Sequence, residues 1–86
     1  MTPSTLTVTI QDPNGLHLRK GRDLVYAANR YQAAITASNL SRSTRSVDVK
    51  SILDLMQLQA RQGHAIRFHA TGPDAEEALR TLSQLF

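Results

Sequence analysis

Residues 5–10 alternate strictly between threonine and an aliphatic residue, Thr-Leu-Thr-Val-Thr-Ile. A repeat of two places successive side chains on opposite faces of an extended chain, and β-branched residues favour that conformation. The pattern predicts a strand that buries its aliphatic face and exposes its threonines. The turn residues Asp12-Pro13-Asn14-Gly15 follow at once and must end this strand. Any fold of this chain therefore begins with a half-buried strand and a tight turn.

Helical spacing follows the turn. Small and apolar residues recur every three or four positions from Leu18 to Tyr31, which predicts an amphipathic helix over this range. A two-turn helix is predicted over residues 51–58, because Ser51 stands at the position of an N-cap and an apolar run follows it. A last helix is predicted from Asp74 onward, with a proline near its first position. Its buried side is expected to contain Ala75, Ala78, Leu79, Leu82, Leu85 and Phe86.

Three further segments have strand character. Residues 33–38 and 45–49 are short and extended, and the polar link between them predicts a hairpin with a long loop. In residues 66–71 apolar side chains alternate with polar ones, which predicts a fourth strand. The helices and strands are interspersed along the chain. This order predicts an α+β fold, an open-faced sandwich in which three helices cover one face of a four-stranded antiparallel sheet, formed as one domain over residues 1–86.

Composition narrows the class of protein. Hydrophobic residues make up 41% of the chain and charged residues 20%, as in a globular domain. There is no cysteine, which excludes disulfides, thiolate zinc sites and a thiol nucleophile. Residues 1–10 show neither a basic nor an apolar leader region, and no apolar run reaches the length of a membrane span. We therefore expect a cytoplasmic protein without membrane insertion.

The positive charge is concentrated in one stretch. The formal net charge is +3, and residues 19–50 contain seven of the ten lysines and arginines but only two aspartates. Such an excess suits a nucleic acid, an acidic protein surface or a phosphate, and it is also typical of a solvated face. The few aromatic residues do not interleave with the basic ones, so nucleic-acid binding is not expected.

Metal and nucleotide sites are not indicated. His64 and His69 are expected to be ordinary surface or strand-edge histidines, and no pair of carboxylates stands at ligand spacing. There is also no glycine-rich nucleotide loop and no serine nucleophile motif. We therefore expect neither a metal nor a cofactor.

His17 stands where the turn gives way to the first helix. The first backbone N–H groups of a helix lack intrahelical acceptors, and the helix dipole favours negative charge there. Neutral imidazole is a nucleophile, and a phosphoryl group on its ring would meet these amides and the guanidinium of Arg19. The same residues also fit an ordinary surface histidine beside an arginine, and the local context alone favours that interpretation.

Residues 14–19, Asn-Gly-Leu-His-Leu-Arg, resemble the active-site signature of the HPr family, the histidine-containing phosphocarrier proteins of the bacterial phosphoenolpyruvate:sugar phosphotransferase system. Residues 45–58 resemble the second signature of that family, a strand that leads into a short helix beginning with a regulatory serine. Residues 62–63 and 72–79 are similar to its last strand and helix. The resemblance covers residues 6–86.

The resemblance implies a function as a phosphocarrier that is not itself an enzyme. His17 would receive a phosphoryl group from Enzyme I and pass it to IIA domains, while Arg19 and Lys20 would hold the phosphate. The resemblance also implies that Ser51 can be a target of HPr kinase/phosphorylase, although a plain N-cap explains a serine there equally well. An apolar patch that docks the partners is expected beside the histidine and comprises Leu18, Ile52, Leu53 and Met56.

The chain departs from the family pattern at several positions. Lys20 and Gly21 replace the usual Pro-Ala, which removes the rigidity of proline and costs about 1 kcal/mol of helix propensity at the glycine. Gln59 stands where a glycine often closes the short helix. A second hypothesis is therefore a regulatory binding module controlled through Ser51, with weakened phosphotransfer. Ile52 also has an alternative role, in which it completes the core.

Overall fold

The sheet is organised around the last strand of the chain, β4 (Ala65–Thr71). The computed structural model describes residues 3–86 and places β4 between β1 (Ser4–Thr9) and β2 (Ala34–Asn39). Strand β2 pairs in turn with β3 (Val47–Asp48), and every pair is antiparallel. The predicted four-stranded antiparallel sheet is thus confirmed. The first two residues of the predicted domain lie outside the described part.

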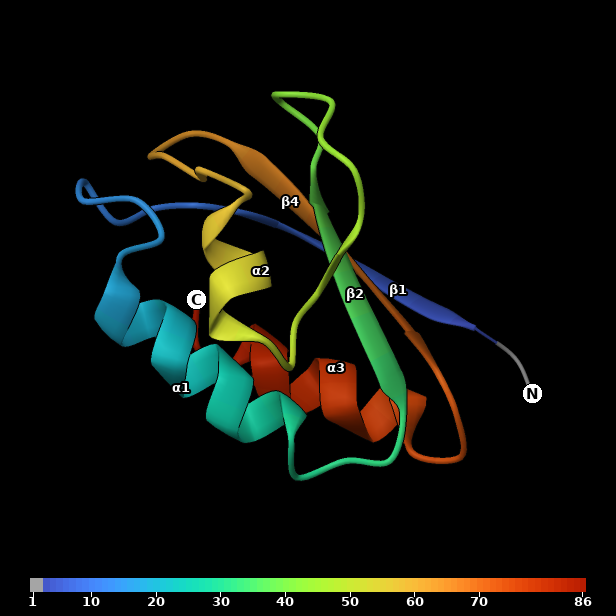
Figure 1. The fold of residues 1–86 in the computed structure, drawn as a ribbon. Coiled ribbons are helices and arrows are strands. Elements are labelled where there is room, and N and C mark those ends of the chain that lie inside the picture. Colours follow the sequence, from blue (N-terminus) through green and yellow to red (C-terminus); the bar gives the residue numbers. More distant parts are fainter. Residues whose placement is uncertain (1–2) are drawn as a thin grey trace.

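Three helices lie on one side of this sheet: α1 (Leu18–Ala28), α2 (Ile52–Met56) and α3 (Ala75–Ser83) (Figure 1). The arrangement confirms the predicted open-faced sandwich. In the part of the chain that the structure describes, no helix is both long and apolar enough to span a lipid bilayer. The end of the chain returns to the beginning of α1, where the Leu85 carbonyl accepts a hydrogen bond from the Lys20 side chain (Figure 1).

The core between the sheet and the helices contains many small residues. Phe68 is its largest fully buried side chain, and β4 buries Ile66 and Phe68 while it exposes Arg67 and His69. Burial of one large apolar side chain stabilises the fold by about 1.5–3 kcal/mol. Small side chains let helices approach a sheet closely. The buried alanines of this core are Ala27, Ala28, Ala33, Ala37, Ala60, Ala70, Ala75 and Ala78.

Helix α1 is shorter than predicted. It ends at Ala28 instead of Tyr31, because the backbone N–H groups of Arg30 and Tyr31 bond the carbonyls three residues back, those of Ala27 and Ala28, each at 3.2 Å. The side-chain Nδ2 of Asn29 holds this end of the helix, since it donates to the Val25 carbonyl at 2.8 Å and to the Lys50 carbonyl at 3.3 Å. The chain therefore leaves the helix three residues early.

Helix α2 and strand β3 are also shorter than predicted. Helix α2 lacks the predicted last two residues, because Gln57 is its C-cap and Gln59 then takes a left-handed backbone with φ of 46°. The chain thus turns away at the position where the family often has glycine. Strand β3 contains two residues of the predicted 45–49, since only Thr36 and Ala37 of β2 pair with it.

The last helix differs from the prediction at both ends. Pro73 lies just before the helix, near its first position as predicted, but the helix begins at Ala75, and Asp74 is the N-cap residue without a capping bond from its side chain. The Asp74 carboxylate instead accepts the backbone N–H groups of Gln32 and Ala33, each at 2.9 Å, and so holds the connection between α1 and β2. Phe86 is 38% exposed, although its ring packs against that of the core phenylalanine.

A buried polar cluster includes one histidine. His64 precedes β4 and is half-buried, and its Nδ1 accepts the backbone N–H of Arg61 at 3.1 Å. The Nδ2 of the fully buried Asn39 lies 3.0 Å from the same Nδ1 and donates to the Leu58 carbonyl at 3.1 Å, while its Oδ1 accepts the Ser41 N–H at 3.0 Å. His64 therefore lies at the edge of β4, one of the two places expected for it, and its ring also links β2 to the segment between α2 and β4.

The left-handed residue after α2 allows a stability test. We expect Gln59→Gly to raise the free energy of unfolding by about 0.5–1 kcal/mol, because glycine adopts a positive φ without the clash of a Cβ atom. The exposed bond from Arg42 to the Gln59 side chain, which would be lost, contributes less than this. Urea denaturation measures the change. Gln57→Gly is the matched control, since Gln57 has φ of −68° and glycine there should destabilise; a Gln59→Gly protein no more stable than wild type would contradict the argument.

The carboxylate of Asp74 makes the stability of the fold depend on pH. The backbone N–H of Gln32, together with that of Ala33, lowers the pKa of this carboxyl below its ordinary value. A lowered pKa adds stability above the ordinary carboxyl pKa, and this stability is lost as the pH falls through the lowered value. We therefore expect Asp74→Asn to reduce the Tm at about pH 7, and we expect this difference to shrink as the pH falls through the lowered pKa of the carboxyl. Glu76→Gln, in the exposed first turn of α3, is the control; an Asp74→Asn effect that persists undiminished in acid would count against this role.

Candidate functional site

The site begins at the residue that caps α1. His17 has an extended backbone, with φ of −81° and ψ of 171°, and is the N-cap of the helix. Its ring Nδ1 accepts the backbone N–H of Lys20 at 3.4 Å, and its carbonyl accepts that of Gly21 at 2.9 Å. The imidazole thus fills a place that serine, threonine, asparagine or aspartate usually occupies. Its Nδ1 faces the end of the helix where an anion is favoured.

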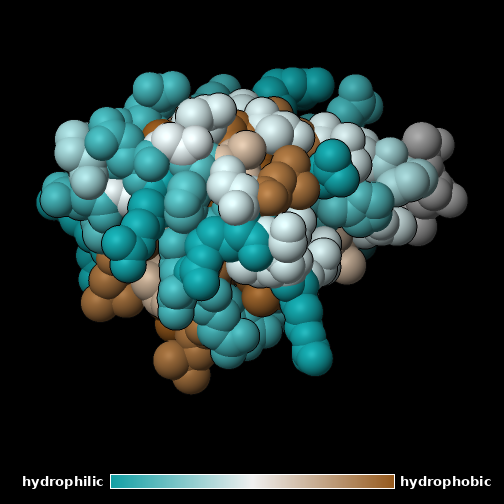
Figure 2. All heavy atoms as spheres, turned by 90° about the horizontal axis from the view of Figure 1, so that it is seen from above, coloured by the Kyte–Doolittle hydropathy of each residue, from teal (hydrophilic) through white to brown (hydrophobic). Residues whose placement is uncertain are grey.

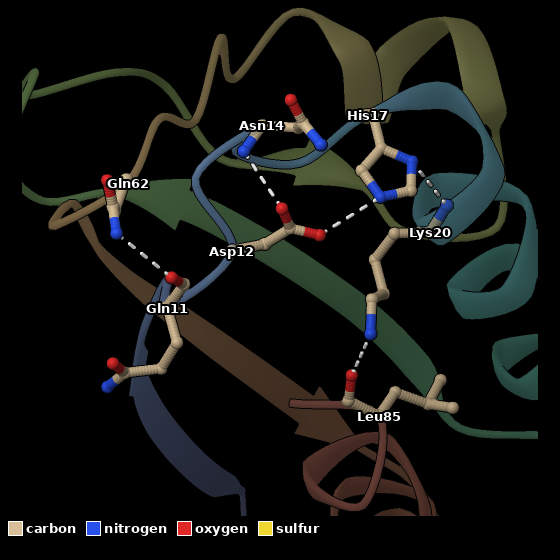
Figure 3. A network of polar contacts seen from close by, with 7 residues as sticks. All are labelled: Gln11, Asp12, Asn14, His17, Lys20, Gln62 and Leu85. Atoms are coloured by element: carbon tan, nitrogen blue, oxygen red, sulfur yellow. Dashed lines mark hydrogen bonds and ion pairs between the residues drawn. The ribbon is translucent and has the colours of Figure 1, made fainter.

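The other ring nitrogen contacts Asp12, which the sequence indicates only as part of a turn. Its Oδ2 lies 3.2 Å from His17 Nε2, and its Oδ1 accepts the backbone N–H of Asn14 at 2.8 Å (Figure 3). The Asn14 N–H lowers the pKa of Asp12 most, and the hydrogen bond to His17 and the charge of Lys20 lower it further. Asp12 is therefore ionised at neutral pH.

The turn that carries these groups requires glycine. Gly15 has φ of +69°, and a Cβ atom there would lie 2.5 Å from the Ala60 carbonyl oxygen and 3.0 Å from Arg61 Cα. The next residue, Leu16, donates its N–H to that same Ala60 carbonyl at 2.9 Å. The turn is thus packed directly against the segment before β4. This contact fixes the position from which His17 starts the helix.

The two basic residues predicted to hold a phosphate lie in different directions. The Lys20 Nζ donates to the Leu85 carbonyl and lies 5.9 Å from the centre of the Phe86 ring, so its side chain points away from His17 (Figure 3). Only the backbone N–H of Lys20 faces the imidazole. Arg19 is exposed and lines a groove between α1 and α2.

Apolar side chains are exposed beside the site. Leu18 is 67% exposed and Leu53 is 78% exposed, while Ile52 and Met56 are half-buried. The space-filling view shows hydrophobic side chains projecting at one edge of a largely hydrophilic surface (Figure 2). The structure brings α1 and α2 together around a groove of 510 Å³. Its lining consists of Leu18, Arg19, Arg22, Val25, Tyr26 and Ile52.

Gly21 allows this close approach of the two helices. It is buried in α1, and a Cβ atom on it would lie 2.5 Å from Met56 Cε and 3.0 Å from Ile52 Cδ1. The ends of these two side chains occupy the space that an alanine methyl group would need. Ile52 contacts α1 here and also lines the groove, but among the described residues it belongs neither to the buried core nor to the partly buried side chains packed against that core. Its role in docking stays a prediction.

Ser51 is the N-cap of α2, as predicted. Its backbone is extended, and its Oγ accepts the N–H of Asp54 at 3.3 Å. The side chain is half-buried. Within residues 3–86 no three histidine, aspartate or glutamate side chains gather in a way that could hold a metal ion.

Known proteins share this sequence and fold. Residues 4–86 match the family model of the PTS HPr component phosphorylation site. The phosphocarrier protein HPr of Xylella fastidiosa (strain Temecula1) is 38% identical over 79 residues, which cover 92% of this chain and 85% of that protein. A crystal structure of the phosphocarrier protein HPr from Bacillus anthracis superposes with a TM-score of 0.87 at 32% identity, covering 99% of this chain and 98% of the other.

Longer proteins also contain a matching segment. A multiphosphoryl transfer protein of Haemophilus influenzae is 37% identical over 78 residues, which cover 91% of this chain. The match spans 16% of that protein and 20% of a second multiphosphoryl transfer protein, from Vibrio cholerae. The family match extends over nearly all described residues and includes the turn, His17 and the helix that His17 caps. This chain belongs to the HPr family of phosphocarrier proteins of the phosphotransferase system.

Proposed function

We propose that this chain carries a phosphoryl group on His17, which it receives from Enzyme I and passes to IIA domains. The observation that carries the proposal is the place of His17 Nδ1 at the N-terminus of α1, where the Lys20 backbone N–H faces it. Membership of the HPr family supports the same role. The proposal includes a cytoplasmic location, where metabolism produces phosphoenolpyruvate.

The geometry suits a group that is held loosely enough to be passed on. Nδ1 accepts a hydrogen bond from a single N–H donor at 3.4 Å, which is long for a hydrogen bond. This weak bond leaves the Nδ1 lone pair available to attack an incoming phosphorus atom. Once attached, the phosphoryl oxygens would accept the same N–H and lie at the positive end of the helix dipole. Such a position stabilises an anion by about 0.3–1 kcal/mol, which favours the bound group without trapping it. Arg19 is the proposed second contact of the phosphate.

The exposed apolar residues are the proposed docking surface. Leu18 follows His17 directly, and Leu53 is the most exposed large hydrophobic residue of the described chain. Arg19 and Arg22 border the same groove. An apolar surface with a basic rim fits partners that combine hydrophobic and acidic side chains. Transfer to more than one partner needs such a surface, because each partner must reach the same histidine.

The regulatory hypothesis through Ser51 has less support. The Ser51 hydroxyl already accepts the Asp54 N–H, and this contact accounts for a serine at the position without any modification. The carrier hypothesis is supported by His17, by the helix end and by the apolar surface together. Phosphorylation of Ser51 by HPr kinase/phosphorylase stays a prediction, and it would place about two negative charges beside the docking surface.

A labelling experiment tests the carrier role. Incubation with Enzyme I and radiolabelled phosphoenolpyruvate should give an acid-labile label on the wild-type protein and none on His17→Ala. The matched control is His69→Ala, which removes an exposed histidine of β4 and should keep the label. Label that persists in His17→Ala, or no label on wild type with several Enzyme I proteins, would refute the proposal.

A second pair of variants separates the roles of the two basic residues. Lys20→Met should lower the free energy of unfolding by about 1 kcal/mol, because it loses the bond to the Leu85 carbonyl. It should retain the label, since the N–H that faces His17 belongs to the backbone. Arg19→Met should change stability by less than about 0.5 kcal/mol and slow phosphoryl transfer. Loss of label in Lys20→Met at unchanged stability would instead show that its ammonium holds the phosphate.

A further inference from the structure

The contact between Asp12 and His17 has no part in the carrier role described so far. The carboxylate Oδ2 lies 3.2 Å from Nε2, and the two side chains are 35% and 36% exposed. We propose that Asp12 is a positioning residue, which holds His17 in the tautomer with its proton on Nε2 and so leaves Nδ1 as the phosphoryl acceptor. This inference rests on the proposed function of His17.

The surroundings of the ring select one tautomer. A backbone N–H can only donate, so the nitrogen that faces Lys20, Nδ1, must be the acceptor. The single proton of a neutral imidazole then sits on Nε2 and is donated to the Asp12 carboxylate. The opposite tautomer would set two N–H groups against each other at Nδ1 and a lone pair against a carboxylate at Nε2. Both contacts would be repulsive.

Asp12 is itself held in place. Its Oδ1 accepts the Asn14 N–H at 2.8 Å, and its own carbonyl accepts the Gly15 N–H at 2.9 Å, so the turn fixes the carboxylate before the ring meets it. The Lys20 charge lies near enough to favour the ionised carboxylate. Figure 3 shows the carboxylate and the Lys20 backbone nitrogen on opposite sides of the imidazole. The negative charge of Asp12 is therefore placed away from the nitrogen that would carry the phosphate.

The tautomer matters for both transfer steps. In the first step the Nδ1 lone pair forms a bond to phosphorus, while the bond from phosphorus to the donor breaks and its electron pair leaves with the donor. In the second step a lone pair of a nucleophilic side chain on the IIA domain forms a new bond to phosphorus, while the N–P bond breaks and its electron pair returns to Nδ1. The proton stays on Nε2 throughout, so the group that departs is neutral imidazole and not the far more basic imidazolate. The Asp12 carboxylate accepts a hydrogen bond from this N–H, which keeps the proton on Nε2, and its negative charge offsets the positive charge of the phosphorylated ring.

Three variants of Asp12 test the inference. Asp12→Asn keeps an acceptor for the Asn14 N–H and removes the charge, Asp12→Ala removes both, and Asp12→Glu restores the carboxylate. Asp23→Asn, at an exposed position of α1, is the matched control. Backbone amide NMR spectra show whether the turn is intact. The ring ¹⁵N chemical shifts, followed to alkaline pH until they no longer change, report the tautomer without any phosphoryl transfer.

The expected results differ among the variants. Wild type and Asp23→Asn should show the Nε2–H tautomer, Asp12→Ala should show a mixture, and Asp12→Glu should recover at least part of the wild-type pattern. Transfer from the phosphorylated protein to a IIA domain should slow by about threefold to tenfold in Asp12→Asn and Asp12→Ala, the range for a charge-assisted hydrogen bond that water partly screens.

Two other results would overturn the inference. Ring shifts that are unchanged in Asp12→Ala would show that Asp12 does not select the tautomer, and faster transfer in Asp12→Asn would show that its charge opposes the phosphate. In either case normal labelling of His17 would leave the proposed function standing. Wild type that takes no label would refute the proposed function, whereas the ring shifts would still decide the role of Asp12.

Discussion

The start of α1 depends on a hydrogen bond to an imidazole. A serine or asparagine would cap this helix equally well, but neither can take up a phosphoryl group and release it from a ring nitrogen. By capping the helix with His17, the chain places the proposed phosphoryl acceptor in a contact that also starts the helix. The turn before it, the left-handed Gly15 and the bond from Leu16 to Ala60 together set where that ring lies. The sheet supplies the fixed ends of this turn.

Periodic patterns predicted the layers of the fold better than the contacts of the site. The alternation in residues 5–10 and 66–71 located the ends of β1 and β4 to within one residue. A strand with one buried face and one exposed face needs alternating apolar and polar residues, whatever its tertiary contacts. The predicted helices extend too far, since α1 ends in backbone bonds to carbonyls three residues back and α2 is followed by the positive φ of Gln59, and neither feature produces a periodic pattern in the sequence. His17 could be singled out only through its neighbours in sequence and the family resemblance.

Asp12 and Asn39 show what a sequence pattern leaves out. Asp12 contacts His17, five residues later, because the chain reverses direction between them. Turn residues in a sequence predict such a reversal but not the directions of the side chains. Asn39 meets His64 across 25 residues of chain. Two lysines of the positively charged stretch 19–50 make hydrogen bonds within the fold. Lys20 donates to the Leu85 carbonyl and Lys50 donates to the Tyr31 carbonyl. Part of the charge excess therefore ties segments together and is not free to attract a partner.

The missing side chain of Gly21 has an effect at the surface. The ends of Met56 and Ile52 lie over this glycine, so a methyl group added at position 21 would have to push them aside. Ile52 also lines the groove beside the exposed leucines, although Gly21 itself is buried. A buried substitution at this position would therefore reshape the groove while every exposed residue stays the same, so surface comparison alone would not identify which HPr proteins exchange partners.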